Sequence, residues 1–372
     1  MDKIVKLENS KKRVLLGMSG GVDSSVAALL LKQQGYEVIG VFYKLWHPKS
    51  YRENSCCNLE SVETAREVCD LIGIDFYVFD AKKEFKKDVV DDFIFQYSQG
   101  RTPNPCVVCN NKIKFGWFID KMKKLNCDFV ATGHYVRSKV VSNKYKLFMA
   151  KDVRKDQSYF LWQLSQDQIK YALFPLGKYH KQDVRKIAQK HNLPVYDKSD
   201  SQDVCFVQDD VASFLGEYIE ASYDKGDVVY VDKTIIGKHN GLFDYTIGQR
   251  SKISNIKYHK IADDIDKRNV PPLYVVKIDR DKNQLVLGLD SHLYGSKLYA
   301  KQINILNHDA ICKNIDLRAK IRSNAKLANC EIKFIAKDKL EVFFKKPQRA
   351  ITPGQSIVFY KQEELIGGGV IV

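Results

Sequence analysis

The chain has 372 residues, of which 44% are hydrophobic and 28% are charged, and its formal net charge is +15. This length leaves room for two or three domains, and the composition is that of a globular protein rather than a disordered or fibrous one. No apolar run approaches the roughly 20 residues of a membrane span. The apolar stretch after the basic N-terminus, 14–16, is too short for a signal peptide. We therefore expect a cytoplasmic protein with no membrane partner.

Strand and helix patterns alternate over the first 135 residues. Apolar and alternating runs predict strands at 14–16, 37–46, 74–80 and 128–132, and apolar residues at helical spacing predict helices at 22–31, 59–72, 83–97 and 114–125. This alternation predicts an α/β domain with a doubly wound parallel sheet, whose ligands bind beyond the carboxyl ends of the strands. The glycine-rich segment 17–25, the segment 43–46 and Gly133-His134 all follow predicted strands.

The glycine-rich segment joins the first strand to the first helix and reads Gly-Met-Ser-Gly-Gly-Val-Asp-Ser-Ser. A helix start offers free backbone amides and the positive end of a dipole, and glycine lets a phosphate approach closely. The lysine of a kinase-type P-loop is absent, and the dinucleotide pattern G-x-G-x-x-G does not fit. The segment resembles the S-G-G-x-D-S loop of the ATP pyrophosphatases (PP-loop enzymes), which cleave ATP between its α and β phosphates. Asp23 can hold Mg²⁺ through water there, or act like a helix cap.

The segment 99–111 interrupts the alternation. Pro103 and Pro105 are incompatible with a regular helix, so we expect a rigid loop that holds its side chains in fixed places. Further along we expect a hairpin at 136–149 with its turn at 142–143, and helices at 158–174 and 180–191. After 212, short strands between turns are predicted at 227–231, 234–237 and 245–248, and the pattern from 274 onward is β throughout, which favours a small closed barrel.

Nine cysteines are spread over the chain, at 56, 57, 69, 106, 109, 127, 205, 312 and 330. In a long cytoplasmic protein they are expected to be reduced, so catalysis or metal binding is favoured over structural disulfides. Cys109 lies in the proline-containing segment and Cys205 follows two aspartates. With an ATP loop, they indicate sulfur chemistry in which ATP activates a carbonyl oxygen of the acceptor. A buried, unreactive thiol is the alternative, and we expect it for Cys69, Cys127, Cys312 and Cys330.

Other residues leave alternatives open. Cys106 and Cys109 form a C-x-x-C pair with no second pair at zinc-site spacing, and an iron–sulfur cluster on these two and Cys205 remains an alternative. His134 can contact substrate or phosphate, or make a structural hydrogen bond. The net positive charge favours nucleic acid as a partner, against a generally basic surface. Two basic runs suit a phosphate backbone, or solvated strand faces: Arg318, Lys320, Arg322 and Lys326, and Lys345, Lys346 and Arg349.

Seven motifs in order across nearly the whole chain resemble the tRNA-specific 2-thiouridylase family. They are G-M-S-G-G-V-D-S (17–24), G-R-T-P-N-P-x-x-x-C-N (100–110), A-T-G-H-Y (131–135), K-D-Q-S-Y-F-L (155–161), D-S-Q-D-V-C-F (200–206), I-G-Q-R (247–250) and T-P-G-Q-S (352–356). The resemblance implies a PP-loop catalytic domain at 1–212, a small central domain at 213–283 and a tRNA-contacting β-barrel at 284–372. It implies ATP-dependent 2-thiolation of the wobble uridine, position 34, in tRNAs for Lys, Glu and Gln.

The resemblance also implies roles for individual residues. Cys109 matches the catalytic nucleophile, and Cys205 the cysteine that carries a persulfide received from a cysteine desulfurase or a sulfur carrier. ATP-contacting positions are matched by Gly17, Met18, Ser19, Gly20, Gly21, Val22, Asp23, Ser24, Tyr43 and Gly133. tRNA-contacting positions are matched by Asn104, Pro105, Cys106, His134, Lys155, Asp156, Gln157, Arg322, Ser323 and Gln355.

Two departures from the family pattern stand out. Arg322-Ser323-Asn324-Ala325 replaces the frequent R-Y-R-Q, which puts barrel contacts to tRNA in doubt, and Ser251-Lys252 replaces the usual Lys-Gly. Two other function classes were weighed. An adenylating enzyme with a small-molecule substrate explains the loop but neither the cysteine pair nor the basic barrel. A non-catalytic RNA-binding or iron–sulfur protein leaves the loop without a role.

Overall fold

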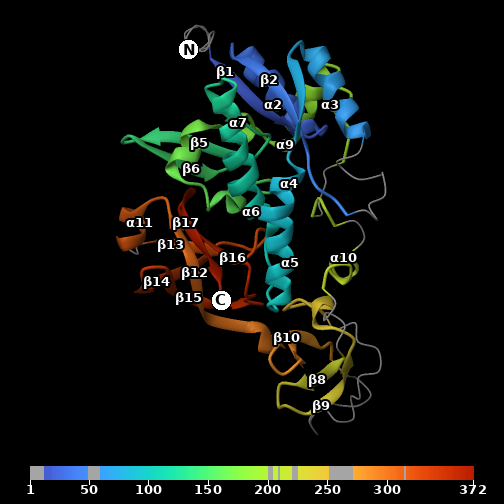
Figure 1. The fold of residues 1–372 in the computed structure, drawn as a ribbon. Coiled ribbons are helices and arrows are strands. Elements are labelled where there is room, and N and C mark those ends of the chain that lie inside the picture. Colours follow the sequence, from blue (N-terminus) through green and yellow to red (C-terminus); the bar gives the residue numbers. More distant parts are fainter. Residues whose placement is uncertain are drawn as a thin grey trace.

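The computed structural model describes residues 12–48, 59–199, 204–207, 210–219, 225–250, 271–313 and 316–372. Three units follow one another in Figure 1: a parallel sheet with its helices at the top, a β-barrel at the lower left and a small sheet at the bottom. No helix among these residues is long and apolar enough to cross a membrane.

The first unit is a five-stranded parallel sheet in the order β3-β2-β1-β4-β7. Its strands are β1 Arg13–Met18, β2 Glu37–Lys44, β3 Asp75–Asp80, β4 Phe129–Ala131 and β7 Ala172–Leu173. Side chains of β1 point alternately into two cores, because Val14 and Leu16 pack on one face of the sheet and Leu15 on the other. The central strand is therefore buried on both sides, as the wholly apolar run predicts.

Helices cover both faces, so the predicted doubly wound α/β fold is confirmed (Figure 1). One face is covered by α2 Val22–Gln33, α3 Leu59–Ile72 and α9 Lys181–Lys190, and the other by the helical run that ends in α7 Phe118–Lys124. The predicted helix at 83–97 is a run of α4 Lys82–Phe85, the π-helix η1 Lys86–Val90 and α5 Asp91–Ser98.

The prediction of a loop across 99–111 is wrong from Pro105 onward. A helix begins there, as α6 Pro105–Cys109, and continues through the π-helix η2 Asn110–Trp117 into α7. Pro105 occupies the first helical turn, where its fixed φ suits the helix and its missing N–H has no intrahelical partner to lose. Cys109 therefore lies on a helix rather than in a loop.

The predicted helix at 158–174 is also wrong in part. The chain forms a short 3₁₀ helix, η3 Ser158–Leu161, then α8 Gln166–Tyr171, and enters β7 at Ala172. The break falls at Ser165, whose hydroxyl caps α8 while the Gln168 side chain accepts from the Ser165 amide. Pro175–Lys178 forms the 3₁₀ helix η4 before α9.

The last unit is a six-stranded antiparallel barrel, which confirms the predicted closed barrel. The strand order β12-β15-β14-β13-β16-β17 closes because β17 also pairs with β12. The strands are β12 Tyr294–Ile305, β13 Leu317–Lys320, β14 Ala328–Ala336, β15 Lys339–Arg349, β16 Ser356–Lys361 and β17 Glu364–Ile371, with α11 His308–Lys313 after β12. The predicted hairpin, β5 Val136–Val141 and β6 Lys144–Met149, joins this sheet where Phe148 pairs with Glu364.

The middle unit holds four strands in the order β10-β11-β8-β9. They are β8 Gly226–Tyr230, β9 Ile235–His239, β10 Tyr274–Asp279 and β11 Gln284–Gly288, preceded by α10 Val211–Gly216. The strand predicted at 245–248 is absent from the described residues, where the 3₁₀ helix η6 Leu242–Asp244 leads into a turn at Gly248 with φ +87°. Because both partners of β11 belong to this sheet, we propose to end the central domain after β11 rather than at 283.

Candidate active site

The glycine loop between β1 and α2 has the geometry of an anion site. Gly21 is the N-cap of α2 and provides no side-chain cap, so the first amides of the helix are left to a ligand or to water. The hydroxyls of Ser19 and Ser24 lie 3.2 Å apart, and the Ser24 hydroxyl accepts from the Ser19 amide. Gly20 has φ +70°, and a Cβ there would lie 2.5 Å from the Ser61 carbonyl oxygen, so this turn requires glycine.

Tyr43 and Gly133 border this loop, as the sequence resemblance implies. A Cβ on Gly17 would lie 2.6 Å from the Tyr43 hydroxyl, and one on Gly133 would lie 2.9 Å from the Ser24 amide nitrogen. The Tyr43 hydroxyl is buried and has no hydrogen-bond partner among the described residues. An unsatisfied buried hydroxyl beside a phosphate loop is suited to a hydrogen bond with a bound nucleotide.

Asp23 is held by two neighbours. Both of its carboxylate oxygens accept from the Lys181 ammonium, at 2.8 and 2.7 Å, and Oδ1 also accepts from the Tyr135 hydroxyl at 2.7 Å. Sequence reasoning missed Lys181 and Tyr135 in this role. No spacing signal could have found Lys181, since it is 158 positions from Asp23.

Tyr43 connects Cys109 to the glycine loop, because Tyr43 borders Gly17 and interacts electrostatically with Cys109. Its thiol is close enough to add to the rise in the pKa of Tyr43, which burial already raises well above its ordinary value. Cys109 is itself buried, and burial raises the pKa of its thiol to about 11. The Lys114 ammonium acts in the opposite direction and lowers the pKa of Cys109. In this conformation Cys109 is therefore a protonated thiol at neutral pH.

The π-helix explains how Lys114 reaches this thiol. Cys109 is the residue before η2, and the Phe118 amide donates to the Ile113 carbonyl, five residues back. This i→i+5 bonding brings a residue five positions later onto the same side of the helix, which an α-helix would not do. Gly116 is needed in this turn, because a Cβ there would lie 2.8 Å from the Asn111 carbonyl oxygen.

His134 follows β4 and is buried beside the same lysine. Its Nδ1 lies 2.7 Å from the Thr132 hydroxyl. Burial, together with the Lys114 charge, lowers the pKa of His134 well below its ordinary value, so the imidazole is neutral at physiological pH. A neutral imidazole offers a directed hydrogen bond to a base rather than a charge to a phosphate.

The structure brings Cys205 into the same apolar cluster as Cys109. The cluster surrounds Phe206, whose ring centroid lies 5.2 Å from that of Phe93, and half-buried Cys205 packs against it. No disulfide joins Cys109 to Cys205. Residues 200–203 of the motif at 200–206 lie outside the described residues, as do Ser251-Lys252 and the Cys56-Cys57 pair. The two thiols thus belong to one apolar cluster although they are 96 positions apart in sequence.

The residues do not fit a metal centre. Among the described residues, no three His, Cys, Asp or Glu side chains lie close enough together to hold a metal ion. Cys106, the other half of the C-x-x-C pair, is exposed whereas Cys109 is buried. We derive no step from an iron–sulfur cluster.

Comparison with known proteins decides the family. Models of a tRNA methyl transferase HUP domain, PRC-barrel domain and aminomethyltransferase β-barrel domain match residues 12–209, 212–289 and 295–371. The tRNA-specific 2-thiouridylase MnmA of Natranaerobius thermophilus is 43% identical over 371 residues, 97% of both chains, and MnmA 2 of Clostridium tetani is 44% identical over 365 residues, 97% of this chain and 99% of the relative. The chain belongs to the MnmA family of tRNA-specific 2-thiouridylases.

Membership makes this 2-thiouridylase a tRNA-uridine sulfurtransferase. Similar solved structures include the U34-tRNA thiolase NcsA of Methanococcus maripaludis with its [4Fe-4S] cluster, at 22% identity and a TM-score of 0.35, covering 57% of this chain and 64% of that one. A 4-thiouridine synthetase–RNA complex with bound ATP has 17% identity and a TM-score of 0.33, covering 52% and 44%.

The positions that the sequence resemblance assigns to tRNA contact differ in their surroundings. Cys106 and Ser323 are exposed. Others are engaged within the chain. Asp156 accepts from the Ala150 and Ser158 amides, and the Gln157 side chain accepts from the Tyr135 amide. Asn104 and Pro105 lie at the start of α6, and Lys155 precedes η3.

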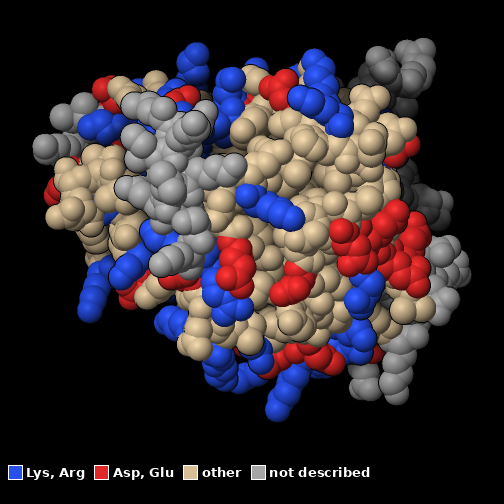
Figure 2. Space-filling view, turned by 90° about the horizontal axis from the view of Figure 1, so that it is seen from above, with Lys and Arg blue, Asp and Glu red and all other residues tan. Residues whose placement is uncertain are grey.

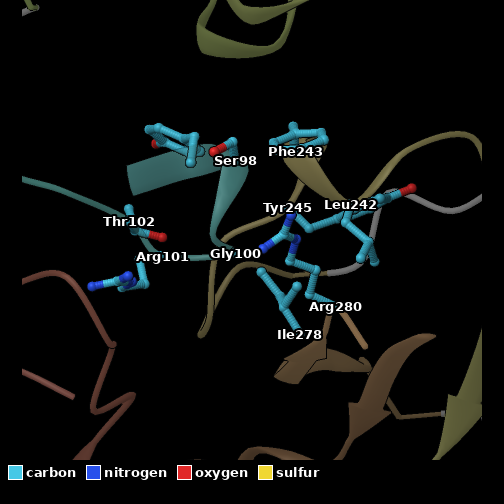
Figure 3. A pocket seen from close by; sticks show the side chains of 10 residues that line it. Ser98, Gly100, Arg101, Thr102, Leu242, Phe243, Tyr245, Ile278 and Arg280 are labelled. Atoms are coloured by element: carbon cyan, nitrogen blue, oxygen red, sulfur yellow. The ribbon is translucent and has the colours of Figure 1, made fainter. Parts of the chain in front are cut away.

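Both downstream domains hold the segment that leads into α6. From the barrel, the Gln355 side chain donates to the Thr102 carbonyl at 2.8 Å. From the central domain, the Arg280 guanidinium donates to the Gln99 side-chain oxygen at 3.0 Å. Figure 3 shows Arg280 beside Gly100 in a small hollow that the segment shares with Leu242 and Tyr245. The three domains therefore meet at the segment that leads into α6, the helix that holds Cys109.

Proposed function

We propose that this enzyme replaces the C2 oxygen of the wobble uridine, position 34, with sulfur in tRNAs for Lys, Glu and Gln, and that ATP activates this oxygen. The observation that carries the proposal is the arrangement of three residues: Tyr43 borders Gly17 of the phosphate loop and interacts electrostatically with Cys109, which shares one apolar cluster with Cys205. It joins a phosphate loop to two thiols from distant parts of the sequence, which an adenylation followed by sulfur transfer requires.

In the first step ATP lies on residues 17–24, with the Tyr43 hydroxyl and Gly133 beside it. The wobble base leaves the anticodon stack so that its C2 oxygen can reach the α-phosphate. A bond forms between this oxygen and the α-phosphorus, and the bond from that phosphorus to the pyrophosphate oxygen breaks. Magnesium would neutralise part of the phosphate charge. The products are an O2-adenylated uridine and pyrophosphate.

In the second step Cys205 carries a persulfide received from a cysteine desulfurase or a sulfur carrier. Its terminal sulfur attacks C2, and AMP leaves with the original oxygen. Cys109, as the thiolate, then attacks Sγ of Cys205. The persulfide S–S bond breaks, its electron pair stays on the sulfur bound to C2, and a Cys109–Cys205 disulfide forms. An external dithiol must reduce this disulfide by two electrons before the next turnover. In the alternative order, Cys109 first releases hydrogen sulfide, which attacks C2.

Cys109 must lose its proton for either order. Its pKa of about 11 leaves few thiolates at neutral pH while the site is closed. We propose that tRNA and ATP binding open the cluster around Cys109, so that solvent and the Lys114 charge lower this pKa. The enzyme would then expose its nucleophile only when the substrate is in place.

The tRNA is expected to approach from the side of α6 and the barrel. The opposite end of the molecule is unsuited to it, since acidic side chains gather on that face on the side where α3 lies (Figure 2). Helix α3 alone presents four exposed carboxylates, although the chain is basic overall. Their negative charges repel a phosphate backbone. These carboxylates are Glu60, Glu63, Glu67 and Asp70.

Mass analysis of tRNA nucleosides tests the proposal. The enzyme, tRNA, ATP, Mg²⁺, a cysteine desulfurase and cysteine should yield 2-thiouridine at position 34, with one AMP and one pyrophosphate for each sulfur. Cys109→Ser and Cys205→Ser should abolish the product and leave tRNA binding nearly intact, while Cys127→Ser serves as a control distant from the site. Retained product in Cys205→Ser contradicts the persulfide role. Conversion of ATP to AMP without RNA would favour a small-molecule substrate instead.

A further inference from the structure

Lys181 provides a positive charge at the start of α2 from a distant part of the chain. Its ammonium contacts both oxygens of Asp23, and its side chain is only 9% exposed. Asp23 is the second residue of α2 and belongs to the glycine loop. The buried charge of Lys181 is therefore fixed at the same helix end whose amides are suited to phosphate.

The glycine loop itself lacks such a charge. Residues 17–25 contain no lysine or arginine, whereas a kinase-type P-loop carries a lysine that reaches the β and γ phosphates. A helix dipole contributes only about half a unit charge, which leaves most of the charge of a triphosphate unbalanced. Phosphoryl transfer in general depends on cations placed where negative charge develops.

The backbone of Lys181 is anchored independently of its ammonium. The Lys181 amide donates to Asp152 Oδ2 at 3.0 Å, in the first turn of α9. Its side chain can therefore change partners without moving the helix. The ion pair is also a poor device for stability alone, because burying two charges costs desolvation that a pair of apolar side chains would avoid.

We propose that Lys181 is the cation that contacts the β and γ phosphates of ATP, and that it stabilises pyrophosphate as it leaves. When the bond between the α-phosphorus and the bridging oxygen breaks, the electron pair stays on that oxygen, and the ammonium balances the new charge. In the ligand-free protein Asp23 serves as the counter-ion, and the Tyr135 hydroxyl holds Asp23 in place. This inference rests on the proposed ATP chemistry and names the residue that serves it.

The test compares Lys181→Met and Lys181→Arg with Lys186→Met, which removes an exposed lysine from the same helix. Binding of α,β-methylene-ATP, pyrophosphate and AMP is measured without tRNA. Loss of a charged hydrogen bond should weaken the first two by about tenfold or more in Lys181→Met. AMP, which lacks the β and γ phosphates, should bind as before. Lys181→Arg should retain most of the affinity, and Lys186→Met should match the unmodified enzyme.

A folded Lys181→Met variant that binds all three ligands normally, or loses all three equally, would overturn the inference and leave Lys181 a structural residue. If that variant does not fold, Asp23→Asn decides, since it leaves the ammonium without its counter-ion. Pyrophosphate should then bind more tightly in the presence of EDTA, and unchanged or weaker binding contradicts the inference. These measurements need neither tRNA nor sulfur, so an enzyme that binds ATP but forms no 2-thiouridine would refute the proposed function alone.

Discussion

Gln355 and Thr102 are joined by a hydrogen bond of 2.8 Å although 253 positions separate them. The bond is one of several between the loop at 352–355 and the segment before α6. The Thr102 amide donates to the Pro353 carbonyl at 2.9 Å, and Gln355 also donates to Pro103. A residue that the family resemblance assigns to tRNA contact therefore also holds the segment before α6 from the barrel side. Binding of tRNA to the barrel can thus reach Cys109 through a short chain of contacts.

Gly354→Ala should disrupt this connection. Gly354 has φ +91°, and a Cβ would lie 2.9 Å from the Thr102 backbone, so alanine is strained and collides with atoms that cannot move aside. We expect a loss of about 2 kcal/mol in the free energy of unfolding, faster proteolysis near residue 102 and slower thiolation. The control is Gly295→Ala, where the new Cβ meets the end of the Ile351 side chain, which can shift. Equal effects in the two variants would contradict the role of the loop.

The reactivity of Cys109 should depend on pH in a defined way. Its folded-state pKa is raised to about 11, compared with 9.0 for an ordinary cysteine thiol. Alkylation of Cys109, followed by mass spectrometry of its peptide, should therefore rise through about pH 11 in the folded enzyme and through about pH 9 in urea. Because the folded state prefers the protonated thiol, its contribution to stability is present below pH 9 and is lost as the pH rises to about 11. The change corresponds to about 3 kcal/mol.

Lys114→Met tests how much the charge of Lys114 contributes to the pKa of Cys109. The Lys114 ammonium lowers the pKa of Cys109, so its removal should raise that pKa and slow alkylation at pH 9 several-fold. It should also raise the pKa of His134, since the same charge lowers it. The matched control is Lys112→Met, which removes an exposed lysine from the same π-helix. Unchanged alkylation in Lys114→Met would show that burial alone sets the Cys109 pKa.

The sequence predicts the parallel sheet well, because its strands are short apolar runs between helices of strong 3.6-residue period. The errors have local causes. A proline breaks a helix at interior positions but is favoured in the first turn. Pro105 is therefore compatible with either a loop or a helix start, and the sequence does not show where the helix begins. At 158–174 the apolar residues are buried by the barrel, where Trp162 donates to the Ser356 hydroxyl, and their spacing reflects tertiary packing rather than a helix face.

Some residues of the candidate site can be predicted from the sequence, and others only from the fold. Gly17 to Ser24 and Cys109 lie in contiguous motifs, so their residue types and spacing indicate the chemistry directly. Lys181 has no such signal, because its role depends on where α9 packs against α2. The π-helix that brings Lys114 to Cys109 is equally hidden, since no residue pattern in 110–117 separates i→i+5 from i→i+4 bonding. Tertiary contacts decide both.

Arg322→Gln should weaken the junction of the central domain and the barrel. The Arg322 guanidinium donates to the Ile247 carbonyl at 2.9 Å and to the Thr352 hydroxyl at 2.7 Å, and burial lowers its pKa. Loss of these bonds should cost about 2–3 kcal/mol, measured from the urea midpoint. Arg318→Gln is the control, because the bond that Arg318 donates to the Gln362 carbonyl lies within the barrel. A pure tRNA-contact role for Arg322 would instead reduce tRNA affinity at unchanged stability.

Lys155 and Asp156 are adjacent positions that the family resemblance assigns to tRNA, and the structure predicts that they act differently. Asp156 accepts from the Ala150 amide at 2.9 Å and from the Ser158 hydroxyl at 2.8 Å, so Asp156→Ala should lose about 1–3 kcal/mol of stability. A carboxylate cannot attract phosphate, and its removal should leave the salt dependence of tRNA binding unchanged. Lys155→Gln should weaken binding and reduce the slope of log affinity against log salt by about one. Filter binding at four salt concentrations separates the two, and an unchanged or steeper slope in Lys155→Gln would refute a phosphate contact.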